Sequence, residues 1–251
     1  MRTLLLFVAV LFSLTVTGQV RGEQADSSIR FPYISVLYGF QLPGADLAER
    51  FGFSHAIGGG FFYKMRKQFT FGISGYYQFG NQVRERDILS SLSSSQGYLI
   101  NVDGEEATIV LYQRGFSMSA HVGYLLPVLA PNPNSGILFM AGMGFLQHRI
   151  RIEDPIGKTP QIEGDYQKGY DRMTNGPALS QFVGYQYFSN NRLLNFTLGV
   201  EFSEAFTRNR RSYNFDEQRR DDKSRLDLLS TFRFSWNIPL YKRMAREYFY
   251  Y

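Results

Sequence analysis

Ser119 and His121 are the residues whose types and spacing come closest to catalytic machinery in this sequence. They lie two positions apart in an alternating segment, so on a β-strand both side chains share one face and lie within reach of each other. A hydroxyl beside an imidazole is a common nucleophile for acyl transfer. Their face also holds Ser117 and Gly123, so the preferred interpretation is a polar network inside a barrel. A lipid hydrolase or acyltransferase is the alternative.

Other candidates for chemistry are sparse. The chain has three histidines and no cysteine, which excludes disulfides, Cys-ligated zinc, iron–sulfur clusters and thiol catalysis. His148 and His55 are both expected to be solvated residues at the rim of a strand. The carboxylate pairs Glu105-Glu106 and Asp221-Asp222 are adjacent in loops, which is a weak basis for acid–base catalysis. We therefore expect no catalysis, no metal site and no cofactor.

The composition is unusually aromatic. Among 251 residues there are 23 Phe and 17 Tyr but a single Trp, and 44% of the chain is hydrophobic. These rings are too many for one compact water-soluble core with an ordinary surface. The net charge of +5 is spread along the chain and does not indicate a nucleic-acid partner.

The N-terminus predicts export. Arg2 precedes an apolar run from Leu4 to Val16, and small residues follow it. That run is shorter than the roughly 20 residues needed to span a bilayer, so a cleaved signal peptide is preferred over an anchor helix. We expect cleavage after Gly18, with Gly22 as the second choice. The predicted divisions are a signal peptide at 1–18, an outer-membrane barrel at 19–241 and a periplasmic tail at 242–251.

The mature chain alternates apolar and polar residues with a period of two, which predicts β-strands. In the segment 69–79, for example, Phe71 and Ile73 share one face while Thr70 and Ser74 share the other. About eight such segments occur. The expected strands are 31–40, 53–64, 68–80, 107–126, 136–150, 178–189, 193–207 and 224–240.

The connections between these strands alternate strictly between long and short. The long ones are 41–52, 81–106, 151–177 and 208–223, and the short ones are 65–67, 131–134 and 190–192. Tight periplasmic turns and long external loops are typical of an up-and-down antiparallel β-barrel in an outer membrane. An even strand number places both termini in the periplasm. Ten strands are the alternative, because a hairpin around 98–104 would fit within the second long loop.

The two strand faces favour a membrane over water. One face carries bulky apolar residues suited to lipid, and the other carries small or polar residues suited to a narrow filled lumen. A soluble lipocalin-like barrel or sandwich would need a polar exterior instead. Aromatic residues at strand ends are expected to form the two interfacial girdles. These residues are Phe31, Tyr33, Phe62, Tyr63, Phe79, Tyr124, Tyr187, Phe188, Trp236 and Tyr241.

The C-terminal segment from Phe232 to Arg243 resembles the last strand and exit of small outer-membrane β-barrel proteins of the Bacteroidota, which are OmpA/OmpX-like barrels. The resemblance covers most of the mature chain in its pattern. It implies insertion by the barrel-assembly machinery, because aromatics two apart on the final strand resemble the signal that this machinery reads. That signal usually ends the chain, whereas here residues 242–251 follow it. The resemblance implies a fold and a location in the envelope of a Gram-negative bacterium, and no reaction.

Charged residues inside the barrel are expected to pair. Glu201 and Arg233 fall on the polar faces of the last two strands, where they are expected to form a structural ion pair across the lumen, with Asp227 joining nearer the outside. Such pairs in an eight-stranded barrel would block diffusion, because its interior is just wide enough for side chains.

Two further segments are candidates for partner contacts. In the last long loop, Arg208, Arg210, Arg211, Arg219 and Arg220 form either a site for lipopolysaccharide phosphates or a partner, or a solvated, self-neutralising loop. The self-neutralising loop is preferred. In the tail, Tyr248, Phe249, Tyr250 and Tyr251 are expected to anchor at the inner interface, cap the lower opening or bind a periplasmic partner.

The expected function is that of a structural or interaction protein of the outer membrane. The expected partners are membrane lipid or lipopolysaccharide, the assembly machinery and an envelope protein. The rivals are a subunit of a larger secretion, gliding or barrel-assembly complex, a lipid-modifying enzyme using Ser119 and His121, and a small-solute channel.

Overall fold

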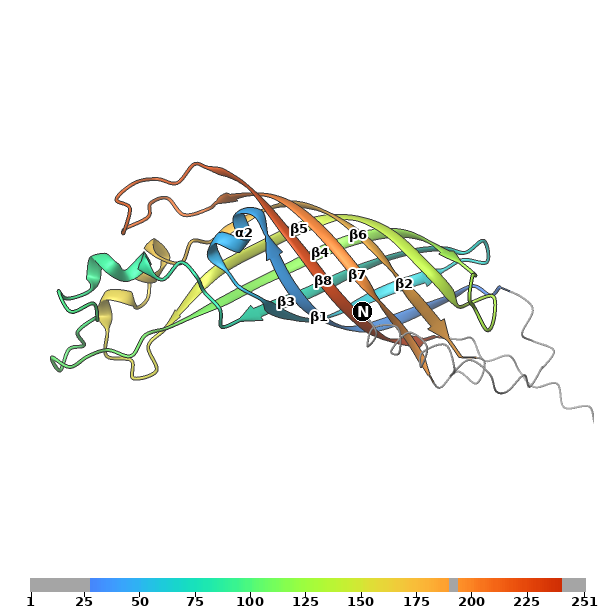
Figure 1. The fold of residues 1–251 in the computed structure, drawn as a ribbon, viewed down its shortest axis with the longest axis horizontal. Coiled ribbons are helices and arrows are strands. Elements are labelled where there is room, and N and C mark those ends of the chain that lie inside the picture. Colours follow the sequence, from blue (N-terminus) through green and yellow to red (C-terminus); the bar gives the residue numbers. More distant parts are fainter. Residues whose placement is uncertain (1–27, 190–193, 241–251) are drawn as a thin grey trace, which may run out of the picture.

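The structure, a computed structural model, describes residues 28–189 and 194–240. Its strands pair antiparallel with their neighbours along the chain, and the first also pairs with the last, so the sheet closes into a barrel (Figure 1). The eight strands are β1 (Phe31–Gly44), β2 (Ser54–Lys64), β3 (Phe69–Gly80), β4 (Val110–Leu126), β5 (Gly136–Glu153), β6 (Thr174–Phe188), β7 (Asn195–Asn209) and β8 (Ser224–Pro239). The predicted up-and-down antiparallel β-barrel is confirmed.

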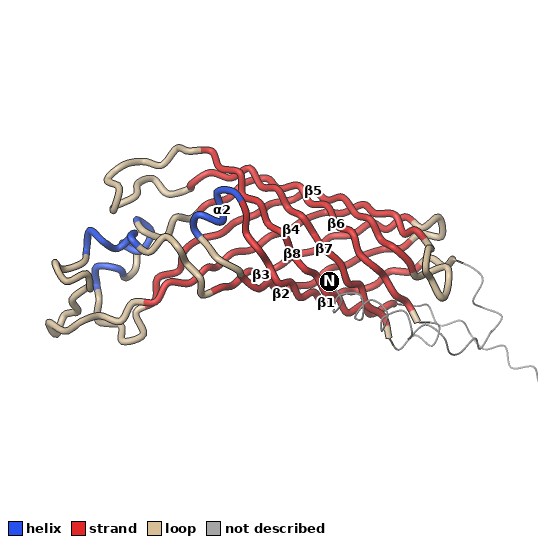
Figure 2. Tube along the Cα trace, in the orientation of Figure 1, coloured by secondary structure: helices blue, strands red, loops and turns tan. Residues whose placement is uncertain are grey.

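The connections give the barrel two unlike ends. Long connections follow β1, β3, β5 and β7 at one end, here called the long-loop end; the opposite end is the short-turn end. All the described helices lie at the long-loop end (Figure 2). They are α2 (Ala45–Arg50) and the 3-10 helices η2 (Asp87–Leu92), η3 (Pro160–Ile162) and η4 (Tyr166–Gly169). The alternative of ten strands is wrong: the segment around 98–104 lies in a loop, where Ile100 and Glu106 form an isolated bridge.

The strand boundaries differ from the predicted ones by a few residues. β1 continues to Gly44 and β6 begins at Thr174, both beyond the predicted limits of 40 and 178. The cause is pairing, because Gly44 lies opposite Leu228 and Thr174 lies opposite Asn209. The barrel therefore extends past the apolar alternation that marks each strand in the sequence.

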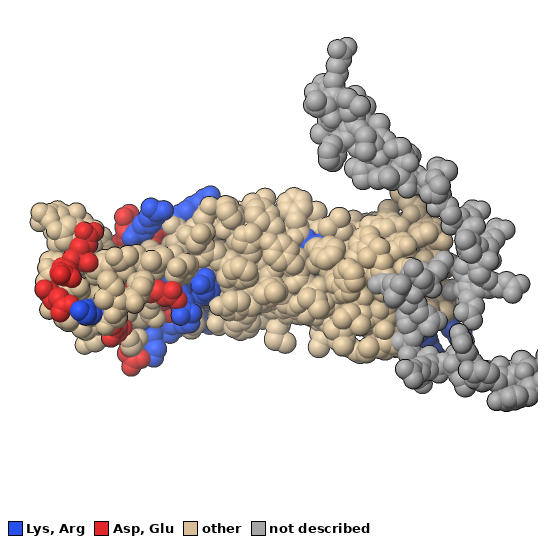
Figure 3. All heavy atoms as spheres, turned by 90° about the horizontal axis from the view of Figure 1, so that it is seen from below, with Lys and Arg blue, Asp and Glu red and all other residues tan. Residues whose placement is uncertain are grey.

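The two faces of the sheet are sharply different. Ile73 is 58% exposed on the outside of β3, whereas Ser74, the next residue, is 5% exposed inside. On the face shown in Figure 3, charged residues gather at the long-loop end, and the surface beside them is almost entirely uncharged. A water-soluble barrel buries its apolar face, whereas a membrane barrel presents it to lipid. The chain therefore folds as a transmembrane β-barrel.

None of the helices among the described residues is both long and apolar enough to cross a membrane.

Four of the expected girdle aromatics point into the lumen instead. Phe31, Tyr33, Phe62 and Phe188 are each 2% exposed and close the short-turn end as a plug. Within the plug, the ring centroids of Phe31 and Phe188 lie 5.0 Å apart, and those of Tyr33 and Phe62 lie 5.3 Å apart. The parity of the strand decides their direction: Phe31 and Tyr33 share the face of the small residue Ser35, which is also buried. Tyr63, Tyr124 and Trp236 lie on the outer surface.

Candidate functional site

The middle of the lumen holds a buried ion pair. Arg233 Nη1 lies 2.6 Å from Glu201 Oε2, and the two side chains are 3% and 8% exposed. The guanidinium also lies 3.9 Å from the ring centroid of Phe182 and donates a hydrogen bond to the Tyr76 hydroxyl at 3.4 Å. β7 and β8 are adjacent strands, and this adjacency brings Glu201 and Arg233 together. Side chains from β3, β6 and β7 thus contact the guanidinium of one residue on β8.

Asp227 does not join this pair, which corrects the expectation for it. Its Oδ2 accepts hydrogen bonds from His148 Nε2 at 2.8 Å and from Thr207 Oγ1 at 2.5 Å, nearer the long-loop end. His148 is 1% exposed and meets the ring of Phe51 edge-on, so it is not a solvated rim residue. The reason is that β5 continues to Glu153 and the loops cover the mouth above it.

Ser119 and His121 do not form the nucleophile–base pair of the enzyme alternative, and His121 instead makes a polar contact inside the barrel. His121 Nε2 lies 2.8 Å from the hydroxyl of Ser74 on β3, the residue directly opposite Ser119. The cavity bordered by Ser119 has a volume of about 20 Å³, room for roughly one water molecule. A substrate therefore has no space at this hydroxyl.

His55 lies outside the barrel among aromatic rings. Its Nδ1 is 2.8 Å from the Tyr38 hydroxyl, and its ring packs against Phe40, Phe53 and Phe79. Among the described residues, no group of three or more His, Asp or Glu side chains has a metal-binding arrangement. The histidines thus serve separate contacts rather than one site.

The four long loops pack into a single unit over the mouth, here called the loop cap. Its apolar core contains residues of the first three long loops, from α2, η2, η3 and the segment after η4, together with residues of the upper strands. Phe215 of the fourth long loop packs edge-on against Tyr170 of this core. Phe51 lies in it with no exposed surface. The buried members are Leu47, Phe51, Val83, Ile88, Leu89, Leu99, Ala107, Ile150, Ile152, Ile162, Tyr170 and Leu229.

Arg172 joins three carboxylates from two other loops inside the cap. It is 3% exposed and lies 3.0 Å from Glu85, 2.5 Å from Asp216 and 3.3 Å from Glu217. Arg50 extends the network, at 3.3 Å from Glu85, and donates a hydrogen bond to Thr174 Oγ1 at 2.8 Å. Since Arg50 follows β1, Glu85 follows β3 and Asp216 follows β7, this network fastens all four loops together.

Electrostatics support the charged form of the network. Burial by itself lowers the pKa of the Arg172 guanidinium, but the carboxylates of Asp216 and Glu85 outweigh it and hold that pKa above its usual value. Burial likewise acts to raise the pKa of the Asp221 carboxyl, and the Arg225 guanidinium 2.6 Å away reverses this and lowers it. Both groups are therefore charged at neutral pH.

The cap is expected to loosen in acid. Because the pKa of Asp221 is lower in the folded cap than in an unfolded loop, its ionised form contributes stability at neutral pH. That contribution is lost as the pH falls below about 4, through the lowered pKa. Amide hydrogen exchange in the segment 214–225, corrected for intrinsic rates, should rise in this window. An Asp221→Asn variant should exchange faster at neutral pH and show a smaller further change in acid. Exchange that is flat with pH in the unsubstituted protein would contradict this assignment.

Three of the five loop arginines considered for anion binding are paired with carboxylates within the loops. Arg211 forms an ion pair with Asp171, Arg219 with Glu217 and Arg220 with Asp222. The other two donate to neutral groups: Arg208 to Ser224 Oγ at 2.9 Å and Arg210 to Asn175 Oδ1 at 2.5 Å. The tail residues Tyr248, Phe249, Tyr250 and Tyr251 lie outside the described residues.

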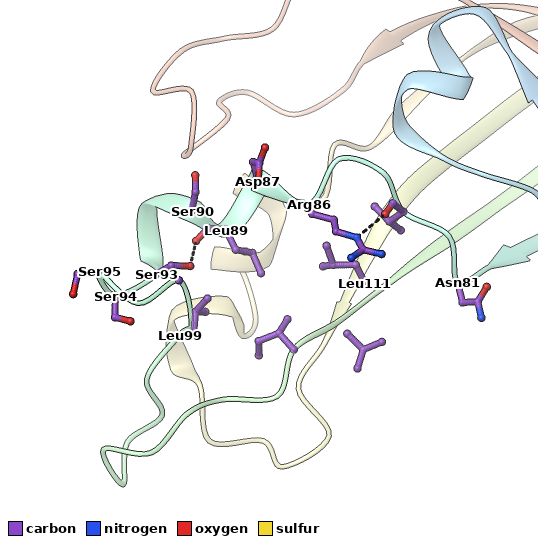
Figure 4. Close-up of a pocket in the computed structure, with 14 residues that line it drawn as sticks. Asn81, Arg86, Asp87, Leu89, Ser90, Ser93, Ser94, Ser95, Leu99 and Leu111 are labelled. Atoms are coloured by element: carbon purple, nitrogen blue, oxygen red, sulfur yellow. Dashed lines mark hydrogen bonds between the residues drawn. The ribbon is translucent and has the colours of Figure 1, made fainter.

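The cap also carries an open cleft of about 610 Å³ beside η2 (Figure 4). Apolar side chains, among them Leu89, Leu99 and Leu111, form its floor, while Ser90 and the run Ser93–Ser95 supply hydroxyls. The Ser93 hydroxyl donates to the Leu89 carbonyl at 3.0 Å, which fixes this wall. The cleft suits a ligand or peptide with both apolar and hydrogen-bonding groups.

No protein-family model and no curated protein matches this sequence. Among solved structures, Neisserial surface protein A is 8% identical, with 83% of this chain and 97% of that chain covered and a TM-score of 0.46. Ail of Yersinia pestis, in complex with the heparin analogue sucrose octasulfate, is 9% identical, with coverages of 83% and 98% and a TM-score of 0.44. The outer membrane protein OprG from Pseudomonas aeruginosa is 11% identical, with coverages of 86% and 99% and a TM-score of 0.43. Identities and TM-scores this low assign no function to this chain.

Proposed function

We propose that this chain is an integral outer-membrane barrel of a Gram-negative bacterium that acts in structure or interaction, with a filled lumen and no catalysis. Its long-loop end faces outward and its short-turn end faces the periplasm. The fusion of all four long loops into one cap carries the proposal, because it presents a fixed surface at the outer end. A barrel built for transport would keep a passage open there.

The lumen supports this assignment at both ends. The aromatic plug fills the short-turn end, the Glu201–Arg233 pair occupies the middle, and the cap covers the mouth. Ser119, the hydroxyl considered for catalysis, borders a space for roughly one water molecule. Solute passage and lipid hydrolysis would both need room that these side chains occupy.

A gel and a pull-down test the proposal directly. The folded barrel should migrate differently in unboiled and boiled lanes, and protease added to whole cells should reach only the loops. A tagged chain would then be isolated from gently solubilised outer membrane, beside a variant with Ser93 and Ser94 replaced by Trp to fill the cleft. A partner retained by the unsubstituted chain and lost with the filled cleft would identify the interaction surface. An absent heat shift, or a Ser119→Ala variant that alters the lipid composition, would overturn the proposal.

Conductance provides an independent check on the filled lumen. The protein reconstituted in a planar bilayer should leave the current at baseline, because the pair and the plug leave no continuous path. A known porin in the same bilayer serves as the positive control. Stable single-channel steps from this protein would rule out a filled lumen.

A further inference from the structure

Arginines gather on one side of the barrel where the apolar belt meets the loop cap. The outward-facing residues there include Arg114 on β4, Arg149 and Arg151 on β5 and Arg208 on β7, and Arg210 follows β7. These five arginines are here called the arginine band. The next outward residue below Arg114 is Phe116, 39% exposed, and the one below Arg208 is Phe206, 55% exposed. The band therefore lies directly above lipid-facing rings, at the height of a membrane interface.

The strand register places the members of the band side by side. Arg114 lies directly opposite Arg149, and Arg151 lies opposite Tyr112. The polar row continues through Gln147 and Asn175, whose side chains are hydrogen-bonded, to Arg208, which lies opposite Asn175. Because Gln147 lies opposite Phe116 on β4, the polar path steps down one outward residue along β5, from Arg149 to Gln147, before it crosses to β6 and β7.

Carboxylates do not neutralise this band. Of the five arginines, Arg151 has an acidic partner, Glu153 at 2.6 Å; the other four form no ion pair with any carboxylate of the described chain. Glu204, the other outward acid on the strands, lies four residues below Arg208 between Phe202 and Phe206. Like charges directly opposite each other on adjacent strands repel, so the Arg114–Arg149 pairing is unfavourable without an anion between them.

The guanidinium of Arg114 is already held in place. It donates to the carbonyl of Gln113 at 2.8 Å and lies 4.7 Å from the ring centroid of Tyr112. Arg210 is likewise fixed by Asn175. An anion that binds here finds these donors ordered beforehand, which reduces the entropic cost of binding.

The opposite side of the barrel has no such band. At the same end of β1, β2 and β3, the outward residues are Phe40, His55 and Phe79, which pack as rings around one imidazole. Among the described strands, the outward-facing cations at this end thus lie on β4, β5 and β7 and not on β1, β2 or β3. A general attraction to the membrane would not need this asymmetry, whereas a lipid headgroup bound on one side would.

We propose that the arginine band binds the phosphate groups of a phosphorylated lipid in the outer leaflet, with the acyl chains lying on Phe116, Phe145 and Phe206 below. The forked guanidinium matches phosphate oxygens in pairs of hydrogen bonds, and the belt supplies the apolar contact. The proposal rests on the membrane insertion proposed above. It adds to that function a lipid class and the residues that select it.

Lipid retention tests the band. The full chain, refolded into phosphatidylcholine vesicles containing a diphosphorylated glycolipid (lipid A), would be purified, and the bound glycolipid per protein measured by mass spectrometry. The variants R114Q/R149Q and R208Q/R210Q should each retain about tenfold less glycolipid. The matched control R219Q/R220Q also removes two positive charges, but from exposed loop positions. This variant should retain the full amount of glycolipid. A dephosphorylated glycolipid should bind no better than the neutral lipid.

The possible results distinguish the lipid site from the proposed function. Equal retention by the band variants and the unsubstituted protein, or equal loss in the control, would overturn the lipid site. Complete displacement of the glycolipid by excess inorganic phosphate would assign the band to free phosphate and would also overturn it. The heat shift on a gel reports insertion separately. An absent heat shift in the unsubstituted protein would refute the proposed function and, with it, this inference. A normal heat shift together with unchanged lipid retention in the band variants would refute the lipid site alone.

Discussion

Replacement of Arg233 by leucine should lower the free energy of unfolding of the barrel by about 3 kcal/mol. The substitution leaves the Glu201 carboxylate inside the lumen without its partner at 2.6 Å. It also removes the cation that lies over the ring of Phe182. Urea unfolding of the protein in phospholipid vesicles, followed by tryptophan fluorescence, measures the change.

The double variant Arg233→Leu/Glu201→Leu is the control for that experiment. Removing both charges replaces an ion pair with apolar contacts, which is often close to neutral for stability. We therefore expect the double variant to recover most of the loss. If Arg233→Leu alone cost less than about 1 kcal/mol, or if the double variant were no better than the single one, the pair would not be a main support of the lumen.

Replacement of Arg172 by alanine should open the loop cap while leaving the barrel closed. Glu85, Asp216 and Glu217 would then face one another without the cation that joins them. Breaking a buried pair of this kind costs about 3 kcal/mol, which corresponds to roughly a hundredfold rise in the population of the open cap. Limited proteolysis of the loops, with the heat shift of the barrel recorded alongside, measures the two effects separately.

Arg219→Ala is the matched control, because Arg219 also contacts Glu217 but is 74% exposed. Exposed ion pairs contribute about 0–1 kcal/mol, so proteolysis of this variant should be nearly unchanged. Equal protection of Arg172→Ala and Arg219→Ala would show that the apolar core, and not the ionic network, holds the cap together.

The barrel was predictable because its signal is local and repeated. On β8, outward rings such as Phe232 alternate with inward residues such as Arg233, and this period of two can be read directly from the sequence. The same parity predicts that Phe31 and Tyr33 point inward, since the small residues Ser35 and Gly39 mark the face of the strand that lines the narrow lumen. Their position at a strand end is also typical of girdle residues, and this competing signal conceals the plug in the sequence.

The cap was not predictable, because its signals are neither local nor periodic. Arg50, Glu85 and Arg172 are far apart in the sequence, and only the closed ring brings their loops to one mouth. His148 was missed for a related reason. Its burial depends on a cover formed by other loops, which no feature of its own strand indicates.

Closure of the ring sets an order of events for the chain as it folds. The hydrogen bond between Ser35 and Asn237 joins residues 202 positions apart, and the whole β1–β8 seam is of this kind. Bringing such distant segments together costs loop-closure entropy before any contact repays it, so this seam forms slowly and last. Until β8 has emerged, β1 has an unsatisfied edge that lipid cannot hydrogen-bond. The growing polypeptide therefore has to be kept unfolded until its final strand is available.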